Sequence, residues 1–342
     1  MNEPSTITLD ISICIANYNG ESVLRDCLKS VYAQHGNFTF EVLLHDDAST
    51  DTSLTLARDE FPDVRVIESH DNVGFCISNN RMVTAARGRY LLLLNNDATL
   101  RPGSLDALLR EAQSTTHPVV LGLPQCTLHD GGLVDRGYEF DLFMNPIPVF
   151  TVAVHEVAAA TGACLWVPRA VWEAVGGFPP WFESIAEDIF LCQAARLLGH
   201  PTRVLDAPCF DHWIGKNLGG GKVVDDKLRT TARRRALSER NKTAVMLLCH
   251  PTWSMLLLLP IHALLLSVEA TFLWLTCADA DKVRRIYGAI LPSLWQQRAN
   301  IIALRRKLHA QQAVSGWHYM RRFKMLPHKL RMLLRHGAPE IR

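Results

Sequence analysis

Three apolar segments near the start of the sequence end in polar side chains. The polar ends are Asn17, Tyr18 and Asn19 after "ISICIA", Asp46 and Asp47 after "EVLLH", and Asn95, Asn96 and Asp97 after "RYLLLL". Asn and Asp are common turn residues, so each end has a plain structural explanation. The alternative is a ligand site, because open α/β sheets bind ligands at the carboxyl ends of their strands. A single segment does not decide between the two.

Strand-like and helix-like segments alternate over residues 11–123. Apolar or β-branched runs at 11–16, 40–47, 64–69 and 89–97 predict strands, and periodic segments at 20–34, 53–61 and 78–88 predict helices. This alternation predicts an α/β fold with a doubly wound, mostly parallel sheet flanked by helices. The four leucines at 91–94 predict a central strand that is covered on both faces.

The predicted topology decides how the polar strand ends are interpreted. All carboxyl ends of a parallel sheet lie along one edge, so the three ends are expected to converge. One polar end is a turn, whereas three that converge predict a pocket. We therefore interpret them as a ligand site.

Residues 124–215 are less regular but contain two further candidates. Residues 161–178 predict a strand, a helix and a Gly-Gly turn, and residues 186–200 predict a helix that opens with Glu187 and Asp188. Acids in a first helical turn also have a plain explanation in the helix dipole. The segment "TRVLDAPCFDHW" predicts a further strand, with His212 just beyond it.

The composition is that of a globular protein, with 48% hydrophobic and 20% charged residues among 342. Nine cysteines form no CxxC pair and mostly lie in apolar runs. This predicts reduced core thiols, and neither a disulfide framework nor a zinc site. The first ten residues, "MNEPSTITLD", have no basic region and no apolar run, so we expect no secretory signal and a cytoplasmic location.

Residues 244–277 are apolar enough for a membrane segment, and basic residues flank them on both sides. Residues 284–342 hold 13 Lys or Arg and a single acid, Glu340; because the whole chain carries +2, residues 1–283 carry −10. Two basic flanks favour the same side of a membrane. Pro260 is expected to split the run into two pieces of about 16 residues, short of the roughly 20 that a span needs. We expect an interfacial or re-entrant helical pair, with a buried pair of core helices as the alternative.

Five segments together resemble the family 2 glycosyltransferases of the GT-A fold. They are "ISICIANYNGESVLRDCLKSVYAQ", "EVLLHDDASTD", the region from "NVGF" to "AARGRYLLLLNNDATL", "TGACLWVPRAVWEAVGGF" and "AEDIFLCQAARLLGH", in the order and spacing of the family over roughly residues 10–260. The later "SERNKTAVMLLCHP" is similar to bacterial rhamnosyltransferases. The resemblance implies an inverting transfer of a sugar from a nucleoside diphosphate sugar to a hydroxyl, in cell-surface polysaccharide synthesis.

The resemblance also assigns roles in donor binding. Ala16, Tyr18 and Asp47 would frame the pyrimidine, with the Asp47 carboxylate accepting the ring N–H. The "NND" at 95–97 occupies the place of the family's DxD motif. There Asn95 and Asn96 would contact the donor, Asn95 at its ribose, and Asp97 would bind Mg²⁺ or Mn²⁺ on the diphosphate. Because Asn95 stands where the family commonly has an acid, tight metal binding by the free protein is not expected.

The remaining assignments concern the transfer step. Asp188 matches the catalytic base of the family, which takes the proton of the acceptor hydroxyl. Gly162 and Ala163 would let the backbone approach the donor sugar. His212 would be a supplementary metal or phosphate ligand, or simply a packed or surface histidine. Phe190 stands where a second acid is frequent, which leaves the class of acceptor open.

Three alternatives stay open beside this interpretation. Nucleotidylyltransferases use a related fold, but "ANYNGES" after the first strand is not the Gly-rich loop that binds a triphosphate. A degenerate GT-A protein serving as a membrane scaffold is opposed by Asp47, Asp97 and Asp188. A basic tail that binds nucleic acid is less favoured than one that meets anionic lipid, because of the adjacent apolar run.

We therefore expect a GT-A catalytic domain over residues 1–240 and a helical, hydrophobic and basic membrane-associating region over residues 241–342. The expected partners are a dTDP- or UDP-sugar donor, with dTDP-rhamnose suggested by the 238–251 segment, a saccharide or lipid-linked saccharide acceptor, and an anionic membrane surface. No nucleic acid partner is expected. The protein would be peripheral or monotopic on the cytoplasmic face of the plasma membrane.

Overall fold

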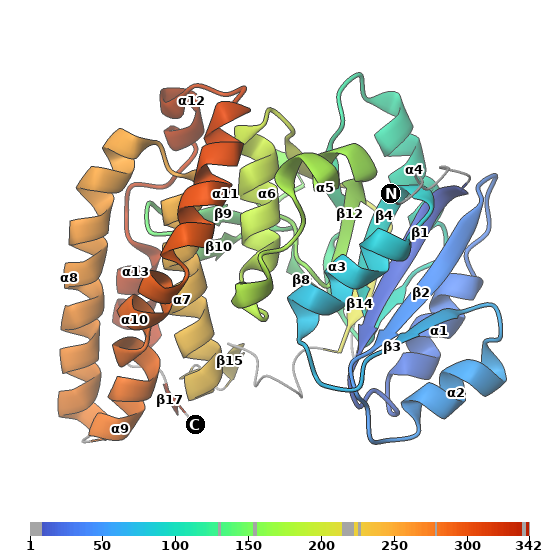
Figure 1. The fold of residues 1–342 in the computed structure, drawn as a ribbon, viewed down its shortest axis with the longest axis horizontal. Helices are drawn as coiled ribbons and strands as arrows, with labels where there is room; N and C mark the ends of the chain where they lie inside the picture. The colour runs from blue at the N-terminus through green and yellow to red at the C-terminus, as the bar shows by residue number, and fades with distance from the viewer. Residues whose placement is uncertain are drawn as a thin grey trace. The chain divides into compact units, whose positions relative to one another are not determined.

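The strands predicted from residues 11–97 form one half of a mixed sheet in the computed structural model of the protein (Figure 1). The structure describes residues 9–128, 131–152, 156–213, 222–224, 227–277, 279–336 and 340–341. Most of the N-terminal segment on which the absence of a secretory signal was predicted, residues 1–8, lies outside the described residues, as does Arg342 of the basic C-terminal region.

Within the described residues, eight strands make the large sheet in the order β11-β13-β6-β12-β4-β1-β2-β3. Their bounds are β1 Leu9–Asn17, β2 Phe40–Asp46, β3 Arg65–Glu68, β4 Gly88–Asn95, β6 Val120–Gly122, β11 Glu156–Val157, β12 Cys164–Pro168 and β13 Thr202–Val204. Strand β1 pairs in parallel with both β2 and β4, and β2 pairs in parallel with β3. Strand β12 runs antiparallel between β4 and β6, so the sheet is mostly parallel but mixed.

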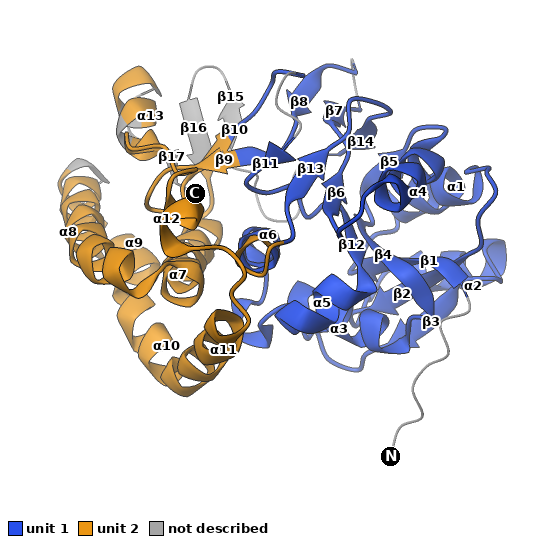
Figure 2. Cartoon of the chain, turned by 90° about the horizontal axis from the view of Figure 1, so that it is seen from above, with its two compact units in different colours: residues 1–138, 148–195, 200–213 blue, residues 139–147, 196–199, 214–342 orange. Residues whose placement is uncertain are grey.

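The position of β4 explains its run of leucines. The strand lies between β1 and β12, and Leu91 to Leu94 are all at most 2% exposed. Helices α3 (Phe75–Ala85) and α5 (Arg169–Val175) lie on one face of the sheet, and α1 (Leu24–Tyr32) and α4 (Ser104–Ser114) on the other (Figure 2). The prediction of a central strand covered on both faces is confirmed.

A second, four-stranded sheet follows the carboxyl end of β4. Its order is β5-β14-β7-β8, with β5 Ala98–Leu100, β7 Gln125–Thr127, β8 Leu133–Asp135 and β14 Phe210–His212. Strand β14 is antiparallel to β5, and this register pairs His212 with Ala98. The sheet therefore brings a histidine from late in the sequence next to the residue that follows Asp97.

The chain divides into two compact units (Figure 2). Unit 1 comprises residues 1–138, 148–195 and 200–213, and contains both sheets described above. Unit 2 comprises residues 139–147, 196–199 and 214–342. The expected division at residue 240, between a catalytic and a membrane-associating region, is a statement about function and stays a prediction.

Unit 2 is mainly helical. Its helices are α7 Ala232–Cys249, α8 Thr252–Cys277, α9 Ala280–Val283, η2 Arg284–Gly288, α10 Ile290–Gln296, α11 Arg298–Ala310, α12 Gly316–Met320 and α13 His328–His336. Helix α7 is central, and its last two turns are almost entirely buried. The Arg305 guanidinium of α11 donates to the carbonyls of Leu247 and His250, at 2.7 and 2.8 Å. These bonds satisfy carbonyl groups at the end of α7 that have no partner within the helix.

The prediction that Pro260 splits the apolar run is wrong. Helix α8 continues through Pro260, and the break between the two helices falls at Pro251. A proline disfavours the helical conformation of the residue before it, and His250 has the extended angles φ −67° and ψ 141°. Pro260 removes one hydrogen bond and crowds the carbonyl of Leu256, but α8 continues through it despite this cost. The result is a single apolar helix in which Thr252–Leu275 contains an 18-residue stretch with a mean hydropathy of 2.0, long enough by length and composition to cross a membrane.

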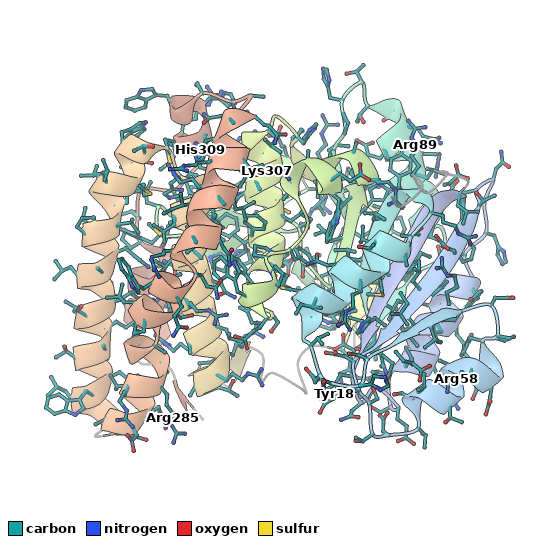
Figure 3. All side chains as sticks on the ribbon, in the orientation of Figure 1. Tyr18, Arg58, Arg89, Arg285, Lys307 and His309 are labelled. Atoms are coloured by element: carbon teal, nitrogen blue, oxygen red, sulfur yellow. The ribbon has the colours of Figure 1, made fainter. Side chains whose placement is uncertain are left out.

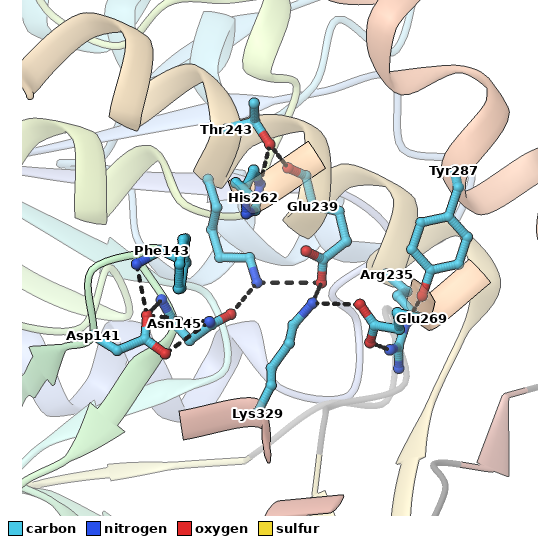
Figure 4. A network of polar contacts seen from close by, with 11 residues as sticks. Asp141, Phe143, Asn145, Arg235, Glu239, Thr243, His262, Glu269, Tyr287 and Lys329 are labelled. Atoms are coloured by element: carbon cyan, nitrogen blue, oxygen red, sulfur yellow. Dashed lines mark hydrogen bonds and ion pairs between the residues drawn. The ribbon is translucent and has the colours of Figure 1, made fainter. Parts of the chain in front are cut away.

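Charged side chains join α8 to the rest of unit 2 in a buried network (Figure 4). Lys329 of α13 donates to Glu239 at 2.7 Å and to Glu269 at 2.9 Å, and Lys242 lies 3.2 Å from Glu239. Arg235 pairs with Glu269 as well. Burial lowers the pKa of Lys242 to about 8, although Glu239 opposes this shift. A buried charge is stable only when paired, so these contacts fix α8 against α7 and α13.

The cysteine prediction is confirmed for the part of the chain that is described. Eight cysteines are free thiols there, and all except Cys209 are buried. Burial raises the pKa of Cys14 and of Cys164 to about 12. These thiols behave as small apolar core residues and not as metal ligands or nucleophiles.

A buried carboxylate joins β1, β2 and the turn that leads into β4, away from the polar strand ends. Glu41 accepts hydrogen bonds from Ser12 Oγ at 2.8 Å, Arg87 N at 2.6 Å and Arg65 Nη1 at 3.1 Å. Burial raises the pKa of Glu41, but the bonds from Ser12, Arg87 and Arg65 outweigh it, so the pKa is lowered on balance. The ionised form is therefore the one that stabilises the fold.

We expect Glu41→Gln to destabilise the protein at neutral pH by about 1.5 to 3 kcal/mol, as for hydrogen bonds to a charged group. A lowered pKa adds stability above the unfolded pKa of about 4.3, and that stability is lost as pH falls through the folded pKa. The difference between variant and wild type should thus shrink as pH falls below about 4.3 and vanish only below the lowered folded pKa of Glu41. Urea unfolding between pH 3 and 7 measures it, with the exposed Glu60→Gln as control. An equal difference at both ends of the range would contradict this role of Glu41.

Candidate functional site

The polar ends of three strands meet at one buried side chain, Asn17, which is 1% exposed. Its Nδ2 donates to Asp46 Oδ1 at 3.0 Å and to Ser53 Oγ at 2.9 Å, and its Oδ1 accepts from Asn96 Nδ2 at 2.8 Å. Asp46 ends β2, and Asn96 directly follows β4. The convergence predicted from a parallel sheet is therefore present, with Asn17 at its centre.

Gly20 leaves room for this cluster. A Cβ at position 20 would lie 2.2 Å from Asn17 Oδ1 and 2.5 Å from Asn96 Nδ2, closer than any side chain tolerates. The Gly20 carbonyl also accepts the backbone N–H of Leu24, which begins α1. The chain can turn from β1 into α1 without displacing the Asn17–Asn96 pair only because this residue has no side chain.

Asp47 is oriented by a loop that leads into α3. Its carboxylate accepts the backbone N–H of Val73 at 2.7 Å and that of Gly74 at 2.9 Å, and the side chain is 5% exposed. Two backbone donors hold the carboxylate in one orientation. The "NVGF" segment thus positions Asp47, a role that was not assigned to it from the sequence.

The other two residues expected around a base, Ala16 and Tyr18, lie beside this cluster. Ala16 is half-buried near the end of β1 and pairs with Asn95 of β4 and His45 of β2. Tyr18 is 46% exposed and lies at the carboxyl edge of the sheet (Figure 3). An exposed aromatic ring at this edge is able to stack on a planar ligand, which a buried ring could not do.

Asn95 links the end of β4 to the turn at 161–163. Its backbone N–H donates to the Ala163 carbonyl at 3.0 Å, and Ala163 is 4% exposed. Its side-chain Oδ1 is buried, and no group among the described residues donates a hydrogen bond to it. A buried amide oxygen without a donor is costly, and a ligand hydroxyl would satisfy it.

Asp97 and His212 form a close pair. Asp97 Oδ1 lies 3.0 Å from His212 Nε2, and the other ring nitrogen, Nδ1, lies 3.2 Å from Gln125 Nε2. The Asp97 carbonyl also accepts the backbone N–H of Trp213 at 2.9 Å. The aspartate comes from the end of β4 and the histidine from β14, so the second sheet holds the two together.

This pair is suited to a divalent cation when a ligand supplies further oxygens. A carboxylate oxygen and an imidazole nitrogen are both common ligands of Mn²⁺, and the carboxylate also suits Mg²⁺. Within the described part of the chain, no group of three or more His, Cys, Asp or Glu could hold a metal ion. Cations of this kind are commonly bound by one or two protein groups together with substrate phosphates. The two residues therefore fit a cation that arrives with an anionic ligand better than one held by the free protein.

Asp188 is held at the start of α6 (Glu187–Leu197) by two backbone donors. Its Oδ2 accepts the N–H of Gly162 at 2.8 Å, and its Oδ1 accepts the N–H of Ile189 at 2.7 Å. A Cβ at position 162 would lie 3.2 Å from the Asp188 Cβ, so Gly162 allows the close approach. Gly162 thus contacts the carboxylate directly, and through Ala163 the same turn contacts Asn95.

The backbone before α6 adopts an unusual conformation. Glu183, Ile185 and Ala186 have positive φ angles of 63°, 70° and 68°, which are uncommon without glycine and most unusual for β-branched Ile185. The Glu183 carbonyl accepts the N–H of Cys76 in α3 at 3.0 Å. Such conformations cost about 1 to 3 kcal/mol each and cluster at functional sites. Here they set the position from which Asp188 projects.

Asp135 and Tyr138 were not predicted as site residues. The Tyr138 hydroxyl donates to Asp135 Oδ2 at 3.0 Å, and Asp135 is 3% exposed. Burial raises the pKa of Asp135; among charged neighbours His212 lowers it and Asp188 raises it further. Asp135 therefore lies within electrostatic reach of both. Neither the type nor the spacing of Asp135 and Tyr138 in the sequence predicted that they lie near His212 and Asp188.

Two other residues bear on the sequence predictions. Phe190 is fully buried, and its ring packs on Phe182 with centroids 5.7 Å apart, so it belongs to the core. Gln125, which contacts His212, went unnoticed because an isolated glutamine in an irregular segment carries no signal. The structure brings Asn96 to Asn17, Asp97 to His212, and Gly162 to Asp188, while Tyr18 remains at the exposed edge.

Two family models match the chain. Residues 12–158 match "Glycosyl transferase family 2", and residues 90–279, more than half of the chain, match "Glycosyl transferase family group 2". Both matches include the carboxyl end of β4 and the turn after it.

Individual proteins are similar over shorter stretches. The chain is 34% identical over 116 residues, 33% of each chain, to the succinoglycan biosynthesis protein ExoO of Rhizobium meliloti. It is 24% identical over 248 residues, 62% of this chain and 76% of the relative, to an N-acetylglucosaminyl-diphospho-decaprenol L-rhamnosyltransferase of Mycobacterium tuberculosis. The matched stretch thus spans only about a third of ExoO.

A solved structure shows the same fold. The crystal structure of GalNAc-T7 with UDP, GalNAc and Mn²⁺ matches with a TM-score of 0.56 at 17% identity, over 70% of this chain and 48% of the other. At this identity the likeness speaks for the fold alone, and it agrees with the α/β architecture predicted from the sequence.

We expect Asn17→Ala to destabilise the protein by about 2 to 3 kcal/mol, because Asp46 Oδ1 and Asn96 Nδ2 both lose their hydrogen bond to Asn17. The matched control is the same substitution at the exposed Asn37. Urea unfolding of both variants measures the difference. If the two variants lost equal stability, Asn17 would not be the residue that joins the strand ends.

Proposed function

Because the chain belongs to the family 2 glycosyltransferases, we propose that it moves a sugar from a nucleoside diphosphate sugar to a hydroxyl of a saccharide or lipid-linked saccharide. The observation that carries the proposal is the group of polar residues at one sheet edge. There the Asn17–Asn96 and Asp97–His212 pairs follow β1 and β4, and the Asp188–Gly162 contact lies where the antiparallel β12 begins beside the end of β4.

In this proposal the strand ends bind the donor. Tyr18 stacks on the base, Asp47 accepts its ring N–H, and the buried Oδ1 of Asn95 accepts a ribose hydroxyl. The donor is a dTDP- or UDP-sugar, and dTDP-rhamnose is a candidate because a rhamnosyltransferase is among the relatives. Asn96 is held by Asn17 at 2.8 Å and lies next to the diphosphate.

Asp97 and His212 would hold Mg²⁺ or Mn²⁺ together with the diphosphate. When bound, the cation supplies Lewis-acid support for the leaving group. Gln125 faces the other ring nitrogen of His212 and keeps Nε2 directed at the Asp97 carboxylate. A cation on Nε2 would need the ring proton on Nδ1, and the Gln125 amide would then present its oxygen to that N–H.

Asp188 is the general base in this proposal. The N–H groups of Gly162 and Ile189 fix the plane of its carboxylate. It accepts the proton of the acceptor hydroxyl while the hydroxyl oxygen attacks the anomeric carbon from the side opposite the diphosphate, which inverts the configuration there. The Ala163–Asn95 contact ties this carboxylate to the donor side of the site.

The protein acts at the cytoplasmic face of the membrane in this proposal, as a peripheral or monotopic protein in polysaccharide synthesis. Support comes from α8, which has the length and hydropathy of a membrane helix. Only 17% of its most apolar stretch is buried, so it is not a core helix of a soluble protein. The excess of cations over residues 284–342 adds attraction to an anionic leaflet, about 1 kcal/mol for each residue near the surface.

We expect Asp97→Asn to abolish transfer without unfolding the protein, because Asp97 is the only carboxylate of its motif. The loss of support for the leaving diphosphate should raise the barrier by several kcal/mol. Transfer from UDP- and dTDP-sugars with and without Mn²⁺ measures it, and Asp59→Asn on the exposed surface of α2 (Ser53–Glu60) is the control. Activity of Asp97→Asn within tenfold of wild type in the presence of Mn²⁺ would refute the assignment.

We expect Asp188→Asn to spare donor binding and to lower turnover by about 10² to 10⁴, as for loss of a general base. The change is nearly isosteric, and the asparagine oxygen can still accept one of the two N–H groups, of Gly162 or Ile189, that the carboxylate accepts. Donor affinity by calorimetry and turnover are measured separately, with Glu187→Gln as the neighbouring control. A fall in affinity as large as the fall in turnover would make Asp188 a binding residue instead. Wild-type turnover in Asp188→Asn would show that another group is the base, whereas absence of transfer by the wild type would favour a non-catalytic scaffold.

A further inference from the structure

The polarity of α8 is opposite to that of an ordinary surface helix. Its buried side includes Ser254 at 1% exposure and His262 at 4%, and half-buried Glu269 lies on the same side. Its outer side is apolar: Leu256, Leu257, Leu264, Val268, Trp274 and Leu275 are 51 to 68% exposed. A surface helix in water buries its apolar stripe and exposes its polar one. Helix α8 does the reverse over most of its length.

The polar groups on the inner side are all partnered within unit 2 (Figure 4). His262 Nε2 lies 2.9 Å from Thr243 Oγ1, and Glu269 pairs with both Lys329 and Arg235. Ser254 Oγ donates to the Pro251 carbonyl at 3.0 Å. The inner side of α8 is thus directed at other helices by specific polar contacts, which leaves its apolar side outward.

The exposed hydroxyls on α8 are satisfied by the helix itself. Ser267 Oγ donates to the Ala263 carbonyl and Thr271 Oγ1 to the Ser267 carbonyl, each at 2.9 Å. In water these hydroxyls would have solvent as a partner. In hydrocarbon the carbonyl four residues earlier is the partner that remains available.

We propose that the outer face of α8 is immersed in the hydrocarbon of a lipid bilayer, with the helix axis along the membrane surface. This deepens the membrane attachment in the proposed function and rests on it. The aromatic rings agree with such a position, because Trp253 and Trp274 lie near the two ends of the face, and Trp253 packs on the exposed Trp317 with centroids 4.8 Å apart. Tryptophan favours the boundary between headgroups and hydrocarbon.

The helices that follow α8 argue against a crossing. Tyr287 of η2 contacts Arg235 near the start of α7, and Arg305 of α11 contacts carbonyls at the end of α7. The chain therefore returns along the length of α7, and the returning α11 exposes Arg298 and Asn300 between these two contacts, about two turns before Arg305, which also donates to Thr252 at the start of α8. If α8 spanned the bilayer, Arg298 and Asn300 would lie at the depth of the hydrocarbon, which excludes them. With α8 along the surface they can remain among the headgroups.

Flotation with phosphatidylcholine vesicles at high salt tests the apolar contact without electrostatic attraction. The variant Leu257→Lys/Leu264→Lys changes the outer face, and the matched control Leu128→Lys/Leu133→Lys changes two exposed leucines of unit 1. The first variant should bind at least tenfold more weakly than wild type, and the control should bind like wild type. Equal binding by all three proteins, or no binding by wild type, would overturn the proposal.

Depth measurements on single spin labels test the orientation and do not depend on those lysine variants folding. Cysteines introduced at Leu257, Leu264 and Leu275 are labelled with Cys209 and Cys277 replaced by serine, since buried thiols such as Cys14 react slowly. Similar hydrocarbon depths at all three positions are expected. A spread approaching the roughly 27 Å between positions 257 and 275 along a helix would show a crossing, and labels that remain in water would overturn the proposal.

Two further measurements distinguish the membrane contact of α8 from the proposed enzymatic function and from a contact between two copies of the chain. Transfer to a water-soluble acceptor by the lysine variant would show that the proposed enzymatic function survives loss of membrane contact. Sedimentation without lipid tests a second copy of the chain as the occupant of the face. A wild-type dimer that becomes a monomer in Leu257→Lys/Leu264→Lys, with vesicle binding unchanged, would replace the lipid by a partner protomer.

Discussion

The site depends on one buried amide. Asn17 is both donor and acceptor, so it can join the end of β2 through Asp46 and the end of β4 through Asn96 at the same time. Leucine could fill the space but would remove the hydrogen bonds to Asp46 Oδ1 and Asn96 Nδ2, and aspartate would place a second carboxylate against Asp46. The leucines of β4 hold the strand in the centre of the sheet, and Asn17 then determines where its polar end lies.

The other two parts of the site are tied to that edge by short contacts. The second sheet places His212 at Asp97, and the 161–163 turn connects Asn95 to Asp188 through Ala163 and Gly162. Each contact joins segments far apart in the sequence, so the arrangement exists only in the folded chain. In unit 2, the polar groups that are taken out of water are likewise paired with one another. At α8 the paired charges lie on the inner side and the apolar side chains lie on the outer side.

Most of the sheet and the location of the site could be predicted from the sequence, because both follow from short-range patterns. The apolar run of β4 indicated a central strand, and its polar end indicated the edge at which ligands bind. The antiparallel direction of β12 could not be predicted, since a run of apolar residues has no direction. The helix break was predicted at Pro260 and lies at Pro251, because either proline disfavours a helical residue before it and the local sequence does not show which one the tertiary packing tolerates inside a helix. The contacts of Gln125 with His212 and of Tyr138 with Asp135 depend on tertiary packing and left no local trace.

The central claim is that the carboxyl edge of the sheet in unit 1 binds a nucleoside diphosphate together with a divalent cation. A crystal structure of the full chain with UDP and Mn²⁺ tests it most directly, because anomalous scattering locates the manganese independently of the nucleotide. We expect the manganese between Asp97 Oδ1 and His212 Nε2, at about 2.0 to 2.2 Å from each atom. The diphosphate should lie beside the ion, and the base should contact Tyr18 and Asp47. Manganese bound elsewhere, or a nucleotide that does not contact the ends of β1, β2 and β4, would contradict it.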